Sequence, residues 1–263
     1  METSPENSNE KFFENVYFSS VEDDAAFTLK RERLHNALAK SNQPYRSGLR
    51  FLREVQEHKY AYQWSWLGVP IIKLPEDIVV LQEFFYIFRP ETVIEVGVAR
   101  GGSLKLYSSL QRMLSINPNI LGIDVKFFPH SIAALEGEIG NGITLLEADS
   151  VSALAIQTVT RFVERATKVL MVLDGNHSHS HVMKELQIFG KILPIGSYIV
   201  VADTITEDLD LAEHNRPWGK GNNPKTALDA YLQEDRSWER DSYWGRRATI
   251  SESRDGWIHK TGR

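Results

Sequence analysis

The sequence contains no cysteine in its 263 residues. This absence excludes disulfide bonds, zinc–thiolate sites, iron–sulfur clusters and thiol nucleophiles. An excess of positive charge is also absent, because 30 Lys and Arg residues and 35 Asp and Glu residues give a formal net charge of -5. We find no long Lys/Arg run that would gather nucleic-acid phosphates. The composition therefore favours a small-molecule partner over a nucleic acid.

Long apolar runs are absent as well. No segment approaches the ~18 uncharged apolar residues that a membrane-spanning helix requires. The first residues, METSPENSNEK, are polar and acidic, whereas an export signal has a basic start and then ~7 to 15 apolar residues. We therefore expect a cytoplasmic protein with no membrane partner.

What is present is the composition of a folded globular protein, with 42% hydrophobic and 25% charged residues. Residues 1–25 are predicted to be a flexible N-terminal segment. Residues 26–75 are predicted to form a helical extension followed by an aromatic loop, and residues 76–263 the main ligand-binding domain. A polar loop near residues 205–224 is long enough to act as a lid over that domain, and the alternative is an ordinary solvated surface loop.

From residue 92 onward, short β-branched runs alternate with longer helix-like segments. The runs are VIEVG, ILGIDV, ITLLEA, KVLMVLD and SYIVVAD. Such alternation is typical of βαβ units, and continuous apolar strands indicate a sheet with helices on both faces. We predict a Rossmann-like α/β fold with a mostly parallel sheet, and further strands at RRATISE and GWIHKT.

The first run ends in a glycine-rich turn that contains Glu95, Gly97, Gly101, Gly102 and Ser103. In open parallel sheets, ligands bind beyond the carboxyl ends of the strands. The glycines are spaced more widely than in G-x-G-x-x-G, and the Glu95 carboxylate suits the cationic methionyl end of S-adenosylmethionine but would repel a pyrophosphate. The turn therefore indicates S-adenosylmethionine rather than a dinucleotide; the plain alternative is a strand-to-helix turn without a ligand.

Acidic and hydroxyl residues end the next two runs. Asp124 is a candidate to accept hydrogen bonds from the ribose hydroxyls. Asp149 and Ser150 are candidates to contact the adenine amino group. All three residues suit helix or loop capping equally well.

The fourth run leads into LDGNHSHSH, which contains Asp174, His177, His179 and His181. An imidazole titrates in the physiological range and can accept a hydroxyl proton, so His177 is the candidate general base and Asp174 its orienting carboxylate or a metal ligand. A zinc cluster is disfavoured because side chains two positions apart diverge on a helix.

The fifth run ends at Asp203. Asp174 and Asp203, at the ends of neighbouring strands, are candidates to bind Mg²⁺, which prefers carboxylates and water and would assist deprotonation of a substrate hydroxyl. The alternative for Asp203 is an ordinary turn aspartate.

The IEVGVARGGS turn, the LDGNHSHSHV segment, the VVADT strand end and the RPWGKGNNPKTAL loop together resemble the cephalosporin hydroxylase family of S-adenosylmethionine-dependent O-methyltransferases, which is related to macrolide-sugar O-methyltransferases. The resemblance runs from about Trp64 to the C-terminus. It implies a homo-oligomer, with His177 as base and Mg²⁺ held by Asp174 and Asp203. It also implies that S-adenosylmethionine is held by Glu95, Gly97, Gly101, Ser103, Asp124 and Asp149.

One position departs from the family pattern, because Ala202 stands where a Glu is expected directly before the strand-end aspartate. Three explanations are open: Glu207 or Asp208 replaces the missing ligand, the ion keeps an extra water, or the site has lost its metal.

Two functions follow. The first is methylation of a hydroxyl on a small molecule such as a sugar or secondary metabolite, in which positioning of the reactants contributes much of the rate. The second is a non-catalytic S-adenosylmethionine-binding accessory protein. A nicotinamide dehydrogenase fits the sheet but not the glycine spacing, and oxidative hydroxylation lacks a facial triad of two His and one carboxylate.

Overall fold

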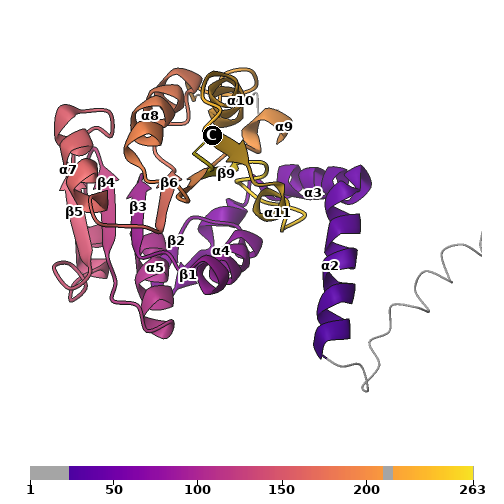
Figure 1. Cartoon of the computed structure of the whole chain (residues 1–263). Helices are drawn as coiled ribbons and strands as arrows, with labels where there is room; N and C mark the ends of the chain where they lie inside the picture. The colour runs from indigo at the N-terminus through magenta and orange to yellow at the C-terminus, as the bar shows by residue number, and fades with distance from the viewer. Residues whose placement is uncertain (1–23, 210–215, 263) are drawn as a thin grey trace, which may run out of the picture. The chain divides into compact units, whose positions relative to one another are not determined.

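The structure is a computed structural model that describes residues 24–209 and 216–262 (Figure 1). The predicted flexible segment, residues 1–25, lies almost entirely outside the described residues. The chain divides into two units, residues 1–42 and 43–263. Helix α2 (Asp24–Lys40) belongs to the first unit. The second unit, which begins within α3 (Asn42–Val55), holds the sheet and all the candidate site residues.

A seven-stranded sheet with the strand order β5-β4-β3-β6-β7-β9-β8 forms the centre of the second unit. Its strands are β3 (Thr92–Val96), β4 (Ile120–Asp124), β5 (Ile143–Glu147), β6 (Val169–Leu173), β7 (Tyr198–Val201), β8 (Trp238–Arg240) and β9 (Trp257–Lys260). The first five are parallel, whereas β9 runs antiparallel to both of its neighbours. The predicted mostly parallel α/β sheet is confirmed. The strand order reverses between β3 and β6, where ligands bind in such sheets.

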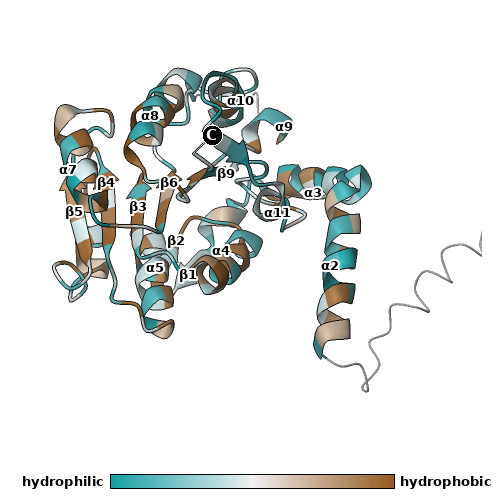
Figure 2. Cartoon of the chain, viewed as in Figure 1, coloured by the Kyte–Doolittle hydropathy of each residue, from teal (hydrophilic) through white to brown (hydrophobic). Residues whose placement is uncertain are grey.

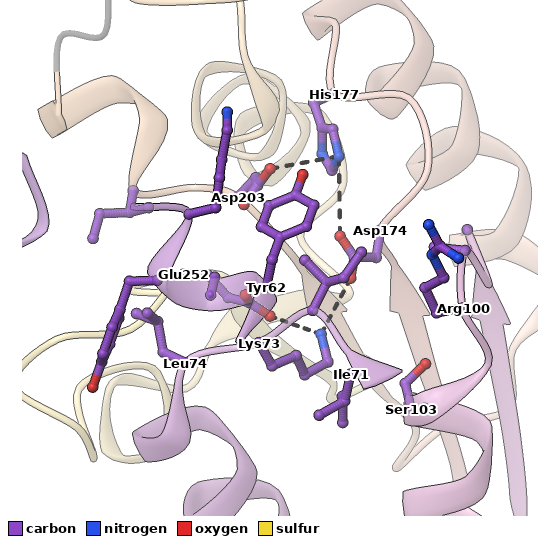
Figure 3. Close-up of a pocket in the computed structure, with 18 of the residues that line it drawn as sticks. Tyr62, Ile71, Lys73, Leu74, Arg100, Ser103, Asp174, His177, Asp203 and Glu252 are labelled. Carbon is purple, nitrogen blue, oxygen red and sulfur yellow. Dashed lines mark hydrogen bonds and ion pairs between the residues drawn. The ribbon is translucent and has the colours of Figure 1, made fainter. Parts of the chain in front are cut away.

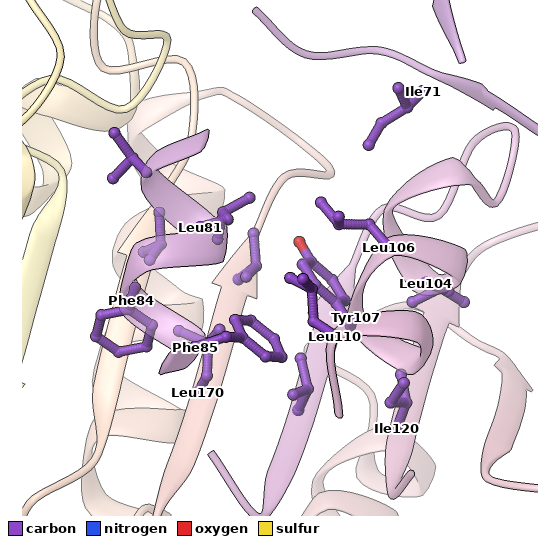
Figure 4. Packing of buried hydrophobic residues seen from close by; sticks show 14 of the residues in the cluster. Ile71, Leu81, Phe84, Phe85, Leu104, Leu106, Tyr107, Leu110, Ile120 and Leu170 are labelled. Atoms are coloured by element: carbon purple, nitrogen blue, oxygen red, sulfur yellow. The ribbon is translucent and has the colours of Figure 1, made fainter. Parts of the chain in front are cut away.

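Alternate residues of the strands pack on opposite faces of the sheet, as the period of two requires. Val93 and Leu170 contribute to one core, which α4 (Pro75–Phe88) and α5 (Gly102–Met113) cover (Figure 4). The neighbouring residues of the same strands contribute to a second core. That core is covered by α7 (Ala153–Val163), α8 (His179–Ile192) and α10 (Pro224–Glu234). Figure 2 shows hydrophobic and hydrophilic residues alternating along these helices, as for α8.

The aromatic loop is more ordered than the sequence predicted. It contains η1 (Tyr60–Tyr62) and an antiparallel hairpin of β1 (Trp64–Trp66) and β2 (Val69–Ile71). The hairpin packs on the start of α5, where a Cβ at Gly102 would lie 2.3 Å from the Pro70 carbonyl oxygen. This contact fixes the chain that leads to Lys73, two residues after β2.

The predicted strand at RRATISE is wrong, because residues 246–252 form no strand and β8 pairs with β9 instead. The segment is held by polar contacts to a helix: Ser251 Oγ and the Glu252 amide both donate to the Asp77 carboxylate at the start of α4. Shorter elements are α6 (Pro129–Ala134), α9 (Thr206–Leu209) and α11 (Ser242–Gly245). Across residues 24–209 and 216–262, none of the helices combines the length and the apolar character that a membrane span requires.

Candidate active site

A cavity of about 450 Å³ opens at the carboxyl ends of β3, β6 and β7 (Figure 3). Small-molecule sites have volumes in this range. The turn after β3 lines one side, and residues that follow β6 and β7 line another. Its lining includes Tyr60, Tyr62, Lys73, Gly97, Gly102, Ser103, Asp174, His177, Asp203, Arg216, Trp218 and Glu252.

The glycine turn has the backbone geometry that only glycine adopts easily. Gly97 has a φ of 90° and Gly101 a φ of 86°, in the left-handed region that other residues seldom occupy. A Cβ at Gly97 would lie 2.1 Å from the Asp174 carbonyl oxygen. The turn therefore brings β3 and β6 together at the cavity. It also starts α5 with Gly101 as an N-cap that offers no side-chain hydrogen bond, which leaves the first amides of the helix available to an anionic group.

Glu95 lies beneath this turn rather than in the cavity. Its side chain is fully buried and accepts hydrogen bonds from Ser103 Oγ at 2.5 Å and Tyr107 Oη at 3.1 Å. Burial raises the pKa of Glu95 to about 7, against the opposing effect of the Lys73 ammonium. In this arrangement Glu95 holds the first turn of α5 in place, and Ser103 is the residue of the pair that lines the cavity.

Asp124 also faces the turn. Its Oδ2 accepts from the Val98 amide at 2.9 Å and the Ala99 amide at 3.3 Å. Asp149 Oδ1 accepts from the Val151 amide two residues on. Asp124 thus caps the turn that borders the cavity, whereas Asp149 makes a local capping contact in the loop after β5.

Ser150 is directed towards α8. Its hydroxyl donates to Glu185 Oε1 at 2.5 Å and lies 3.0 Å from His181 Nε2. His181 Nε2 is in turn 3.2 Å from Glu185 Oε1. The cluster ties the loop after β5 to α8, so Ser150 braces the loop that carries Asp149.

The His181 pair makes stability depend on pH. The hydrogen bond to Glu185 raises the pKa of His181 despite partial desolvation. A raised folded-state pKa adds stability that is fully present below the unfolded value of ~6.5 and is lost as pH rises through the folded value. We expect H181Q to lower the melting temperature most below the unfolded value of ~6.5, with a difference that shrinks as pH rises through the raised folded-state value. The same change at exposed His58 is the control, and a pH-independent difference at His181 would contradict the pairing.

His177 is placed between the two aspartates that the sequence singled out. Its Nε2 lies 3.5 Å from Asp203 Oδ2 and 4.0 Å from Asp174 Oδ1 (Figure 3). Asp203 has a φ of 55°, a left-handed conformation that an aspartate tolerates better than most residues. The strand ends therefore bring together one imidazole and two carboxylates, as their positions in the sequence predicted.

The other two histidines of HSHSH have different surroundings. His179 Nδ1 lies 2.9 Å from Thr226 Oγ1 on α10, and His181 faces Ser150 and Glu185. Since the three rings point to three different places, they form no common zinc site.

Two charged residues of the site were not identified from the sequence. Lys73 Nζ lies 2.7 Å from Glu252 Oε1 and 3.1 Å from Asp174 Oδ2, and the lysine side chain is only 4% exposed. Burial alone would lower the pKa of Lys73, but Glu252 and Asp174 outweigh it and raise the pKa well above its ordinary value. The sequence feature that could have identified Lys73 is its position as the only charged residue of the apolar segment VPIIKLP.

The predicted Mg²⁺ ligands Asp174 and Asp203 line one cavity, but the surrounding residues do not complete a metal site. Ala202, where a Glu was expected, is fully buried.

The two acidic residues that could replace the missing ligand are bound elsewhere. Glu207 Oε2 accepts from Asn223 Nδ2 and the Gly221 amide. Asp208 Oδ2 accepts from the Tyr45 hydroxyl. Within residues 24–209 and 216–262, no group of three or more His, Asp or Glu side chains is arranged to hold a metal ion.

The described part of the predicted lid reaches His177. The Trp218 ring lies 5.2 Å from the His177 ring at 62°, and the Arg216 guanidinium lies 5.6 Å from the Trp218 ring. Asn222 Oδ1 accepts from the His179 amide, which ties the loop to the start of α8. The loop therefore covers His177 with an aromatic ring.

Comparison with known proteins adds family information. Residues 58–261 match the model of the family described as Rhamnosyl O-methyltransferase/CmcI. A rhamnosyl O-methyltransferase of Mycobacterium leprae is 27% identical over 184 residues, which cover 67% of this chain and 76% of the relative. One from Mycobacterium tuberculosis H37Rv is 28% identical over the same length, with 72% of the relative covered.

Two solved structures support the fold. The apo-structure of CmcI-N160 has a TM-score of 0.59 at 20% identity and covers 77% of this chain and 78% of its own. The second structure, cmcI-D160 Mg-SAM, has a TM-score of 0.52 at 18% identity, with 76% and 78% covered. At these identities the likeness concerns the fold alone.

Proposed function

The chain belongs to the Rhamnosyl O-methyltransferase/CmcI family, and we propose that it transfers a methyl group from S-adenosylmethionine to a hydroxyl of a small molecule. The observation that carries this proposal is a single cavity in which the glycine turn, His177 and two carboxylates meet. S-Adenosylmethionine, when bound, supplies a methyl group on a positively charged sulfur. The residues of the chain hold the two reactants and accept the proton that the hydroxyl loses.

We assign cofactor binding to the turn. Gly97, Gly101 and Gly102 let the backbone approach the ligand, and the uncapped amides at the start of α5 suit the methionyl carboxylate. Ser103 lines the same wall, with Glu95 holding it from behind. Asp124 borders the turn, and we assign it to the ribose hydroxyls. Asp149 and Ser150, in the loop after β5, are assigned to the adenine side of the site.

We assign proton removal to His177. His177 would take the proton that the acceptor hydroxyl loses when its oxygen receives the methyl group that S-adenosylmethionine would supply. Asp203 and Asp174 face Nε2 of the ring, so the imidazolium that forms is stabilised by two negative charges. Trp218 covers this position and helps to exclude water.

The acceptor is proposed to be a sugar hydroxyl, by analogy with the rhamnosyl acceptor in the names of the curated relatives. Tyr60, Tyr62 and Trp218 give the cavity an aromatic lining, which is typical of sites that enclose an organic ligand. A homo-oligomeric assembly and a cytoplasmic location, both predicted from the sequence, remain part of the proposal. Light scattering of the purified chain and fractionation of the source cells test them.

Titration of S-adenosylmethionine by calorimetry tests the central claim. We expect saturable binding with NAD as the negative control, because the turn lacks the spacing of a dinucleotide site. Release of S-adenosylhomocysteine in the presence of rhamnosides then tests catalysis. Absence of S-adenosylmethionine binding would overturn the proposal, whereas binding without turnover on any sugar or secondary metabolite would indicate the non-catalytic accessory protein.

A further inference from the structure

Lys73 is a buried cation beside Asp174, one of the two residues to which the family resemblance assigns a divalent metal. Its ammonium lies 3.1 Å from Oδ2 of Asp174, the first predicted metal ligand, and 2.7 Å from Oε1 of Glu252. An isolated ammonium is very costly to bury, so these two carboxylates are the partners that permit it. Figure 3 shows the three side chains in one line of contacts that continues to His177.

The partners of Lys73 are themselves held by the fold. The Glu252 amide donates to Asp77 Oδ2 at 2.9 Å. The Glu252 carbonyl accepts from the Ile205 amide at 3.2 Å, two residues after Asp203. Glu252 therefore approaches the site from the C-terminal segment, next to the loop in which the expected Glu is missing, but its carboxylate binds Lys73.

A divalent ion would find few free ligands and a repulsive neighbour here. Asp174 Oδ2 is engaged by the ammonium, and Ala202 offers no side-chain oxygen. Glu207 and Asp208, the two replacements considered from the sequence, bind Asn223 and Tyr45 instead. Two positive charges sharing Asp174 would also repel each other strongly in a buried setting.

We propose that the Lys73 ammonium is the resident cation of this carboxylate cluster and that the chain works without Mg²⁺. Lys73 is a positioning residue: it holds Asp174 next to His177 and balances the negative charge of the cluster, which a metal ion would otherwise do. This inference rests on the proposed methyl transfer. It assigns to this chain a metal-independent form of the reaction.

Wild-type protein gives the first test. We expect S-adenosylmethionine binding and product release in excess EDTA to stay within about twofold of the values with Mg²⁺. We also expect titration of MgCl₂ into the protein saturated with S-adenosylmethionine to give no binding at concentrations up to about 10 mM. Saturable Mg²⁺ binding within that range, or loss of binding or turnover in EDTA that Mg²⁺ restores, would overturn the inference.

These outcomes separate the inference from the proposed function. S-Adenosylmethionine binding that requires Mg²⁺ overturns only the metal-independent form. No binding with or without Mg²⁺ overturns the methyltransferase proposal itself.

Two substitutions at Lys73 give the second test. K73M removes the charge while keeping much of the side-chain length, and we expect it to gain Mg²⁺ affinity by about tenfold or more. K73R keeps the positive charge and should remain without Mg²⁺ binding, as should K191M, a matched change at an exposed lysine of α8. Circular dichroism checks that each variant is folded. A folded K73M that binds Mg²⁺ no better than K73R would contradict the proposed role of the ammonium. If K73M does not fold, the EDTA and MgCl₂ experiments on the wild-type protein still test the inference.

Discussion

Replacing His177 with alanine is expected to lower kcat by about 10²- to 10⁴-fold, the usual contribution of a positioned general base. The reason is that the imidazole lies in the cavity with Asp203 at 3.5 Å and Asp174 at 4.0 Å, arranged to stabilise the protonated ring. The affinity for S-adenosylmethionine should change little, because the glycine turn forms a separate wall of the cavity. Single-turnover rates and calorimetric binding of the cofactor measure the two effects separately.

The matched control for H177A is H179A. His179 lies two residues further on, at the first residue of α8, and its ring contacts Thr226 on α10 rather than the carboxylates. We expect its turnover to stay within about threefold of wild type. Equal losses of turnover in H177A and H179A would indicate that the integrity of the segment, and not the His177 imidazole, controls the rate. Undiminished turnover in H177A would remove His177 from the mechanism.

Replacing Gly97 with alanine is expected to destabilise the protein by about 3 kcal/mol or more and to abolish cofactor binding. Two costs combine at this position. The φ of 90° is unfavourable for any residue with a side chain, and the new Cβ would lie 2.1 Å from the Asp174 carbonyl oxygen. Relieving that overlap requires β3 and β6 to move apart at the edge of the cavity. Urea denaturation measures the free energy of unfolding.

G140A separates the two costs. Gly140 also has a positive φ, of 76°, but a Cβ there would meet nothing within 4 Å. We expect this variant to lose only about 1 kcal/mol, the cost of the backbone conformation, and to bind the cofactor normally. A similar loss of stability at both positions would show that the approach of Gly97 to Asp174 is not important.

Side-chain direction explains why Glu95 and Ser150 contact other protein groups instead of lining the cavity. Alternation along β3 puts Glu95 on the same face as Val93, beneath α5, where Ser103 and Tyr107 bind it. Ser150 turns towards Glu185 because α8 packs beside the loop after β5. A strand-end position predicts nearness to the site, but the helix that covers that face decides whether a side chain meets the ligand or the protein.

The sequence by itself determined the parallel sheet, the glycine turn and the grouping of Asp174, His177 and Asp203. It did so because apolar periodicity specifies the strands, and parallel strands bring their carboxyl ends to one edge of the sheet. Only the tertiary structure decided that the charges of Lys73 and Glu252 belong to the site. Lys73 is 101 positions from Asp174 and 179 from Glu252. Such pairing depends on how the β1-β2 hairpin and the C-terminal segment pack against the sheet, which local sequence patterns do not specify.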